Sequence, residues 1–211
     1  MKKILLLFIV SALVLSGCMA RNTPKNAGNE MLALSENEMD TITKQAAVLT
    51  EVLVISMPPS AANGMVELDA ITINSMILYS AKYSGTDYPY SDIYIEDEFY
   101  HFPAENVKRV AYELAGKENW ILEGGDVEYN QETDRYDTTL AFSLEGYLQL
   151  EKISARYEEG SSVVIVSFNL LLPTVANGDP ALKDGGSYEV RYSVLNEDGH
   201  SFLRFIEMVK T

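Results

Sequence analysis

The chain has 211 residues, of which 31 are acidic and 16 are basic, so its formal charge is −15 at pH 7. This charge excludes attraction to nucleic acid or to an anionic membrane face through bulk electrostatics, and it leaves cations, basic proteins and neutral ligands as partners. The hydrophobic fraction of 47% is ordinary for a folded protein. A single cysteine excludes a disulfide within the chain, so an apolar core must supply the stability.

The N-terminal residues have the pattern of a secretory signal peptide. Lys2 and Lys3 give a basic start, and residues 4–15 form an apolar run. The run is too short for a membrane-spanning helix, which needs roughly 20 residues, but it fits the apolar segment of a signal peptide. We therefore expect a leader rather than a membrane span.

The motif Leu15-Ser16-Gly17-Cys18 ends this leader and resembles the lipobox of bacterial lipoproteins. The resemblance implies that the Cys18 thiol receives a diacylglyceryl group and that the leader is cut before Cys18. It also implies that the protein is anchored at the extracytoplasmic face of the cell membrane, where two acyl chains hold it stably. The alternative is a secreted protein whose Cys18 lies in the leader by chance.

Three segments follow from this interpretation: a signal peptide at 1–17, a lipidated N-terminus and tether at 18–34, and one globular domain at 35–211. The tether is expected because its residues are mostly polar or helix-breaking and bury too little apolar surface to fold. Loss of Lys2 and Lys3 with the leader takes the charge from −15 to −17. Solubility at a crowded surface is the simplest reason for such a charge.

Three helices are predicted in the first half of the domain. The first covers 36–56, where Ser35 and Glu38 form a capping box and apolar residues recur at steps of three and four. The second covers 67–83 and is apolar on nearly all sides. The third begins with Pro103 and ends before Gly116, which favours a left-handed C-terminal residue. A short strand is predicted at 93–95.

The second half changes to a period of two, which is typical of strands. Polar turns between successive segments indicate antiparallel pairing. Residues 173–187 hold two prolines and three glycines and are predicted as a long loop. The predicted strands are 120–128, 135–144, 147–157, 163–172, 188–194 and 201–209.

These elements predict an α+β fold in which three N-terminal helices pack on one face of a curved antiparallel sheet of about six strands. The order of elements resembles the cone-shaped fold of nuclear transport factor 2, and a cystatin-like sheet wrapped on helices is the alternative. The first resemblance implies a pocket between the sheet and the helices and dimerisation through the sheet. Function does not follow from a fold alone.

An aromatic segment supplies the candidate ligand-binding residues Tyr88, Tyr90, Tyr94 and Tyr100. Tyrosine combines apolar area with a hydroxyl and is enriched in recognition surfaces. The segment would lie at the opening of a cone, where it could bind a glycan or a protein. The alternative is that these rings pack against the neighbouring helices.

The sequence contains little that indicates a metal or cofactor site. The acidic residues near the 130–134 turn lie in an extended hairpin, not in the wrapped loop that calcium requires, and His101 and His200 are expected at the surface or in turns. We expect no metal and no cofactor. The motifs of common hydrolases, nucleotide-binding proteins and zinc enzymes are absent. A buried carboxylate could still act as a base, and Asp137 is the residue to inspect.

The sequence therefore predicts a lipid-anchored binding or interaction module of the cell envelope. Its expected partners are the membrane, through the lipid on Cys18, and a protein or glycan. A small enzyme that uses a buried carboxylate is one alternative, and a structural domain that forms a homodimer is another.

Overall fold

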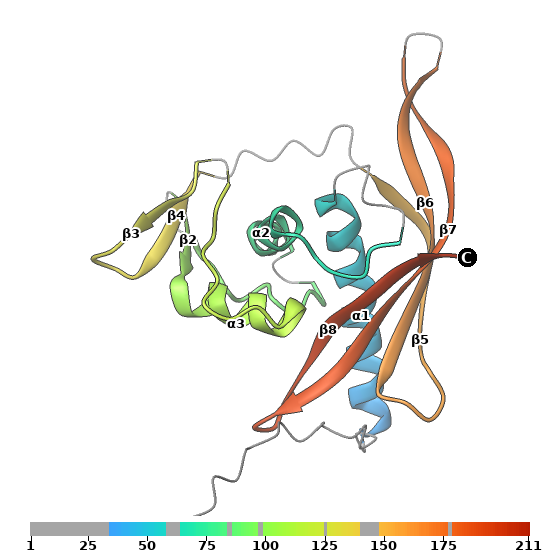
Figure 1. Ribbon diagram of the computed structural model, residues 1–211, viewed down its shortest axis with the longest axis horizontal. Coiled ribbons are helices and arrows are strands. Elements are labelled where there is room, and N and C mark those ends of the chain that lie inside the picture. The colour runs from blue at the N-terminus through green and yellow to red at the C-terminus, as the bar shows by residue number, and fades with distance from the viewer. Residues whose placement is uncertain are drawn as a thin grey trace, which may run out of the picture. The chain divides into compact units, whose positions relative to one another are not determined.

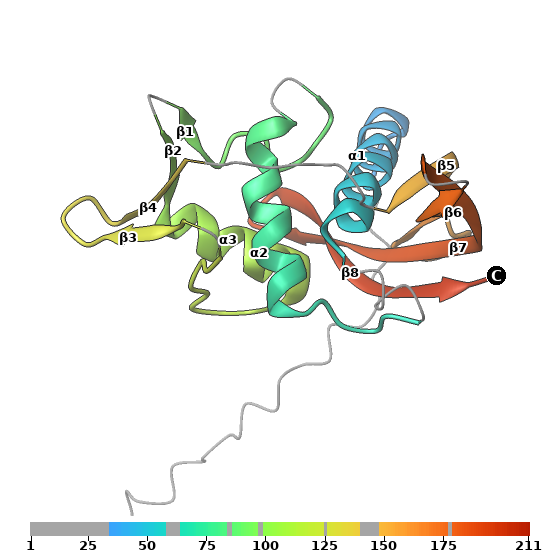
Figure 2. The ribbon, with the colours of Figure 1, turned by 90° about the horizontal axis from the view of Figure 1, so that it is seen from above.

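A computed structural model describes residues 34–57, 64–83, 86–96, 99–124, 126–139, 148–176 and 179–211. Residues 31–211 form one unit, and its described part holds three α-helices and two four-stranded antiparallel sheets. The helices lie between the two sheets (Figures 1 and 2). In these ranges, no helix has the length and apolar character needed to cross a bilayer.

Helix α1 (Glu36–Ser56) begins and ends where the sequence predicts. The Ser35 amide donates to Glu38 Oε2 at 2.8 Å, and the Glu38 amide donates back to Ser35 Oγ at 3.4 Å, which confirms the capping box. The predicted apolar face is buried, with Ala46, Leu49 and Leu53 fully shielded from solvent.

Helix α2 (Ala70–Tyr79) starts three residues later than predicted and continues as a 3₁₀ turn, Ser80–Lys82. The reason is local, because the Asp69 carboxylate accepts a hydrogen bond from the Thr72 amide at 2.7 Å and caps the helix at that point. Helix α3 (Ala104–Ala115) ends at Gly116, which has φ 66° as predicted.

The C-terminal sheet has the strand order β5-β6-β7-β8. Its inner face packs on α1, and alternate residues of β6 supply much of the buried surface there: Val164, Val166, Phe168 and Leu170. The strands are β5 (Gln149–Tyr157), β6 (Val163–Ala176), β7 (Asp179–Glu197) and β8 (His200–Lys210).

The predicted loop at 173–187 is wrong, because β6 and β7 stay paired through most of it. Pro173 lies opposite Leu182, and Val175 lies opposite Pro180. The neighbouring strands stop earlier, since β5 reaches only the position opposite Leu171 and β8 only the position opposite Tyr188. Residues 172–176 and 179–183 therefore form a two-stranded extension, here called the ribbon, that projects beyond the sheet in Figure 1.

The N-terminal sheet has the strand order β1-β2-β4-β3. Its central pair joins β2 to β4 across the intervening helix α3, with His101 opposite Asp137. Among the described residues of the predicted strand 120–128, Glu128 alone lies in this sheet, and the 140–144 part of the next predicted strand is outside the described residues. The strands are β1 (Ile95–Glu96), β2 (Tyr100–Pro103), β3 (Glu128–Asn130) and β4 (Arg135–Thr138).

This pairing overturns the predicted architecture of three helices on one curved sheet of about six strands. The class is α+β, but the strands divide into two sheets, so neither the cone fold nor the cystatin-like alternative describes the chain. The cause is that a period of two identifies a strand but not its partner. No local pattern indicates that β4 bonds to β2 rather than to the strand that follows it.

Candidate functional site

Two of the four candidate tyrosines lie in the core. Tyr88 and Tyr90 are both buried, and their rings meet edge to face with centroids 5.8 Å apart. The Tyr88 hydroxyl donates to the Met76 carbonyl at 2.9 Å. Burial raises the pKa of both hydroxyls well above the ordinary value, so both rings are neutral packing residues rather than part of a surface for a ligand.

The other two tyrosines stay partly accessible. Tyr94 precedes β1 and Tyr100 opens β2, and their ring centroids are 5.8 Å apart. Tyr94 also contacts Phe102, whose ring is fully buried. Tyr88, Tyr90 and Phe102 thus belong to the core, whereas Tyr94 and Tyr100 leave part of their rings at the surface.

Asp137 is bound by His101 and Arg135 rather than held free in an apolar pocket. Its Oδ1 lies 2.7 Å from His101 Nδ1 and 2.9 Å from Arg135 Nε. His101 is buried on β2, which corrects its expected surface position. The contact between His101 on β2 and Asp137 on β4 links the two strands, whereas Arg135 binds the same oxygen from within β4.

The acid with the least accessible side chain in these ion pairs is Glu113, which the sequence did not single out. Its side chain is only 6% exposed, and its Oε1 lies 3.3 Å from His200 Nε2 and 3.8 Å from Arg109 Nη1. The Tyr90 hydroxyl is near enough for the charge of Glu113 to add to the effect of burial on its pKa. The spacing of Arg109 and Glu113, four residues apart on α3, was the available sequence signal. The cluster ties α3 to the start of β8, where His200 is exposed as expected.

A shallow groove of about 370 Å³ lies at the start of α2. Lys117 and Glu67 form an ion pair across it, and the Trp120 indole donates to Asn74 Oδ1 at 2.7 Å. The polar groups of this groove are thus engaged with one another. Its remaining lining is Leu68, Asp69 and Ala70.

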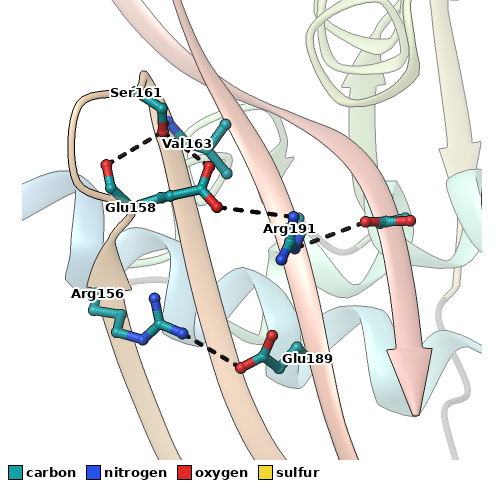
Figure 3. A network of polar contacts seen from close by, with 7 residues as sticks. Arg156, Glu158, Ser161, Val163, Glu189 and Arg191 are labelled. Carbon is teal, nitrogen blue, oxygen red and sulfur yellow. Dashed lines mark hydrogen bonds and ion pairs between the residues drawn. The ribbon is translucent and has the colours of Figure 1, made fainter. Parts of the chain in front are cut away.

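The outer face of the C-terminal sheet carries a network of ion pairs. Arg156 Nη2 lies 3.4 Å from Glu189 Oε1, and Arg191 reaches Glu158 at 3.9 Å and Glu207 at 3.7 Å (Figure 3). Ile165 is only 2% exposed although it faces outward. Its direct cross-strand neighbours are Arg156 and Arg191, whose long stems shield it.

The outer face of the ribbon is different, because it is apolar and uncovered. Leu182 lies directly opposite Pro173, and Val175 is two residues further along β6, so the three share one face. Val175 is 70% exposed and Leu182 43%. Where the strip meets the sheet, the cross-strand neighbour of Leu171 is the exposed Asp184. Sequence reasoning missed the strip because its prolines and glycines indicated a loop.

Within the described ranges, no group of three or more His, Cys, Asp or Glu side chains could hold a metal ion. Comparisons with protein-family models, with curated proteins and with solved structures find no match to this chain. The assignment of function therefore depends on the chain's own residues, and the ribbon is one of the exposed apolar surfaces among the described residues.

Proposed function

We propose that this protein is a lipid-anchored binding module on the extracytoplasmic face of the cell membrane. The observation that carries the proposal is the motif Leu15-Ser16-Gly17-Cys18 at the end of an apolar leader. A thiol at that position can form a stable thioether with a diacylglyceryl group, and two acyl chains are sufficient for a lasting anchor.

The start of the fold is compatible with a tether. Helix α1 begins at Glu36, capped by Ser35, so the chain from Cys18 to the helix is 17 residues long. A flexible segment of that length has an r.m.s. end-to-end distance of about 23 Å. The first turn of α1 would therefore stay near the bilayer.

A binding role is favoured over catalysis because the polar groups of the candidate sites already bind other side chains. Asp137 is shared by His101 and Arg135, and the charges at the α2 groove pair with each other. Among the described residues, the apolar strip of the ribbon is open to a partner, and Val175 there is 70% exposed. Exposed apolar surface of this kind is typical of interaction sites.

Substitution of the proposed lipidation site tests the anchor. Cys18→Ala should move the protein from the membrane to the soluble fraction, and the mass of the wild-type protein should exceed that of its cleaved polypeptide by an attached diacylglyceryl group. The control is Ser16→Ala, which keeps a small residue before the cut and should leave anchoring unchanged. The proposal would be refuted if Cys18→Ala associated with the membrane as the wild-type protein does and if the wild-type protein carried no mass beyond that of its polypeptide.

A further inference from the structure

The groove at the start of α2 is formed by two segments that join regular elements. Residues 67–70 lead into α2, and residues 117–120 follow the end of α3 (Figure 2). The first segment is held in place because the Met65 carbonyl accepts a hydrogen bond from the Met208 amide of β8 at 2.7 Å. Leu68, which is only 3% exposed, fixes the same segment to the core. This wall is therefore ordered before a ligand arrives, which lowers the entropic cost of binding.

Trp120 gives the groove an apolar wall. It is the single tryptophan of the chain, and its side chain is partly accessible to solvent. Its indole N–H donates to Oδ1 of Asn74, a residue of α2 that is 8% exposed. With the N–H engaged, the surface that the ring contributes to the groove consists of carbon and hydrogen atoms. An aromatic surface of this kind packs well against the C–H groups of a ligand.

The polar groups of the groove are held in position but keep further hydrogen-bonding capacity. Glu67 Oε1 accepts a hydrogen bond from Lys117 Nζ, and Asp69 Oδ1 accepts one from the Thr72 amide at 2.7 Å. The hydrogen bond from Lys117, together with its charge, lowers the pKa of Glu67, so that carboxylate is ionised at neutral pH. An ionised carboxylate accepts at both oxygens and an ammonium group has three donors, so each group can bind a ligand as well.

These groups restrict the chemistry of a ligand. Glu67 and Asp69 disfavour an anion, whereas Lys117 and the positive N-terminal end of α2 disfavour a cation. A wholly apolar molecule would cover the charged groups without hydrogen bonds, which costs free energy. A neutral molecule with an apolar face and hydroxyl groups around its rim meets all three conditions. A pyranose ring has this structure.

The size of the groove agrees with a single sugar ring. Its volume of about 370 Å³ is near the lower end of the roughly 300–1,000 Å³ that small-molecule sites span. A ligand of that size is expected to bind with a Kd of roughly millimolar.

We propose that this groove binds a neutral hexopyranose unit. The C–H face of the ring packs on Trp120, and its hydroxyls exchange hydrogen bonds with Glu67, Asp69 and Lys117. The proposal names a ligand for the binding role proposed above and rests on that role, but it does not depend on the lipid anchor.

Tryptophan fluorescence tests the proposal, because the emission of the chain comes from Trp120 alone. Full-length protein in a detergent without a sugar headgroup is titrated with methyl glucoside, methyl galactoside and N-acetylglucosamine up to about 50 mM, well above the expected Kd. Glycerol, a polyol without a ring, is the ligand control. At least one of the sugars should shift the emission in a saturable way, and glycerol should not. The absence of a saturable shift with all three sugars, or an equal response to glycerol, would overturn the proposal.

A pair of acidic residues locates the site. Glu67→Ala should weaken binding about tenfold because it removes the acceptor of the sugar hydroxyls. Glu118→Ala is the matched control, since Glu118 is exposed beside Lys117 but does not line the groove, and its affinity should match that of the wild type. The side chain of Glu67 is 68% exposed, so its loss leaves the fold intact. Equal affinities in the two variants would overturn the site.

The aromatic wall is tested with a second readout. Saturation-transfer NMR detects the ring protons of a bound sugar and does not need a tryptophan. Trp120→Leu should abolish the transfer, whereas Trp120→Phe keeps an aromatic surface and should retain it. Circular dichroism of both variants checks that they fold. Equal transfer in Trp120→Leu and the wild type would contradict packing of the sugar on this ring.

A free sugar and the end of a glycan present the same ring, and lactose distinguishes them. An affinity for lactose within about threefold of that for methyl galactoside indicates the end of a glycan, because the second ring then extends into solvent. Binding of methyl galactoside without binding of lactose indicates a free sugar.

An apolar or charged ligand is the competing interpretation. Val66 and Ile71 flank 67–70 in the sequence and are 74% and 67% exposed, so an apolar peptide would contact them. Val66→Ser should leave sugar binding unchanged, and a loss equal to that in Glu67→Ala would overturn the groove as the site. Tighter binding of tetramethylammonium or acetate than of any sugar would overturn the neutral ligand. Failure of the anchor is distinguishable, because wild-type protein would then appear in the soluble fraction and the same titration would proceed without detergent.

Discussion

The body of the C-terminal sheet and its ribbon are made by the same two strands, yet their outer faces differ sharply. Over the body, Ile165 is 2% exposed because Arg156 and Arg191 flank it. On the ribbon, Val175 is 70% exposed. Side chains alternate between the two faces in both regions, although the register of β7 shifts by one residue where they meet. The difference shows that burial on a sheet depends on neighbouring strands, and β5 and β8 end before the ribbon begins.

The largest expected contrast is in stability. Leu53 is fully buried beneath the sheet, so Leu53→Ala should lower the free energy of unfolding by about 2–5 kcal/mol through lost burial and a cavity. Val175→Ala, on the ribbon, should change it by less than about 0.5 kcal/mol. Urea denaturation of both variants gives the comparison. Similar losses for the two would mean that the ribbon is part of the core.

A smaller effect is expected at the buried polar contact under the body. Tyr192 and Thr50 lie with their hydroxyl oxygens 3.1 Å apart, so Tyr192→Phe should destabilise the fold by about 1 kcal/mol at neutral pH. Burial raises the pKa of Tyr192 above its ordinary value, so the unfolded chain loses this proton first as the pH rises. Wild-type stability should therefore fall above about pH 10.

Tyr192→Phe removes this titratable hydroxyl. The free energy of unfolding that the substitution costs should therefore shrink as the pH rises above about 10. Thermal unfolding from pH 7 to 11 measures this change, and Tyr100→Phe is the control because the Tyr100 ring is partly accessible to solvent. A loss of stability in Tyr192→Phe that grows with pH would contradict a raised pKa of Tyr192 in the folded state.

The smallest expected effect on stability concerns Arg191, whose side-chain stem shields Ile165. Arg191→Ala should cost about 0.5–1 kcal/mol because it removes both the ion pairs and the stem that shields Ile165, whereas Arg191→Met keeps the stem and should cost less. Lys44→Ala, which breaks an exposed pair with Asp40, is the control and should be nearly neutral. Denaturation in low and high salt separates the two contributions. Equal losses in the alanine and methionine variants would show that charge, rather than cover, matters at this position.

Local chemistry made several elements predictable from the sequence. The Ser35 and Glu38 box placed the start of α1, and Gly116 placed the end of α3, because each acts within one turn of helix. The hairpin turns at 130–134 and 196–199 were identified for the same reason. The lipobox motif likewise requires only adjacent residues, and it remains a prediction.

The tertiary structure alone decided which strands pair, where the ribbon extends and which tyrosines are buried. Proline and glycine at 173–187 indicated a loop, but pairing between distant residues kept that segment in a ladder. Tyr88 and Tyr90 carry the same side chain as Tyr94, and only the packing of α2 and α3 around them determined their burial. Caps and turns are set by neighbours in sequence, whereas sheet partners and burial depend on residues tens of positions away, which a local pattern does not encode.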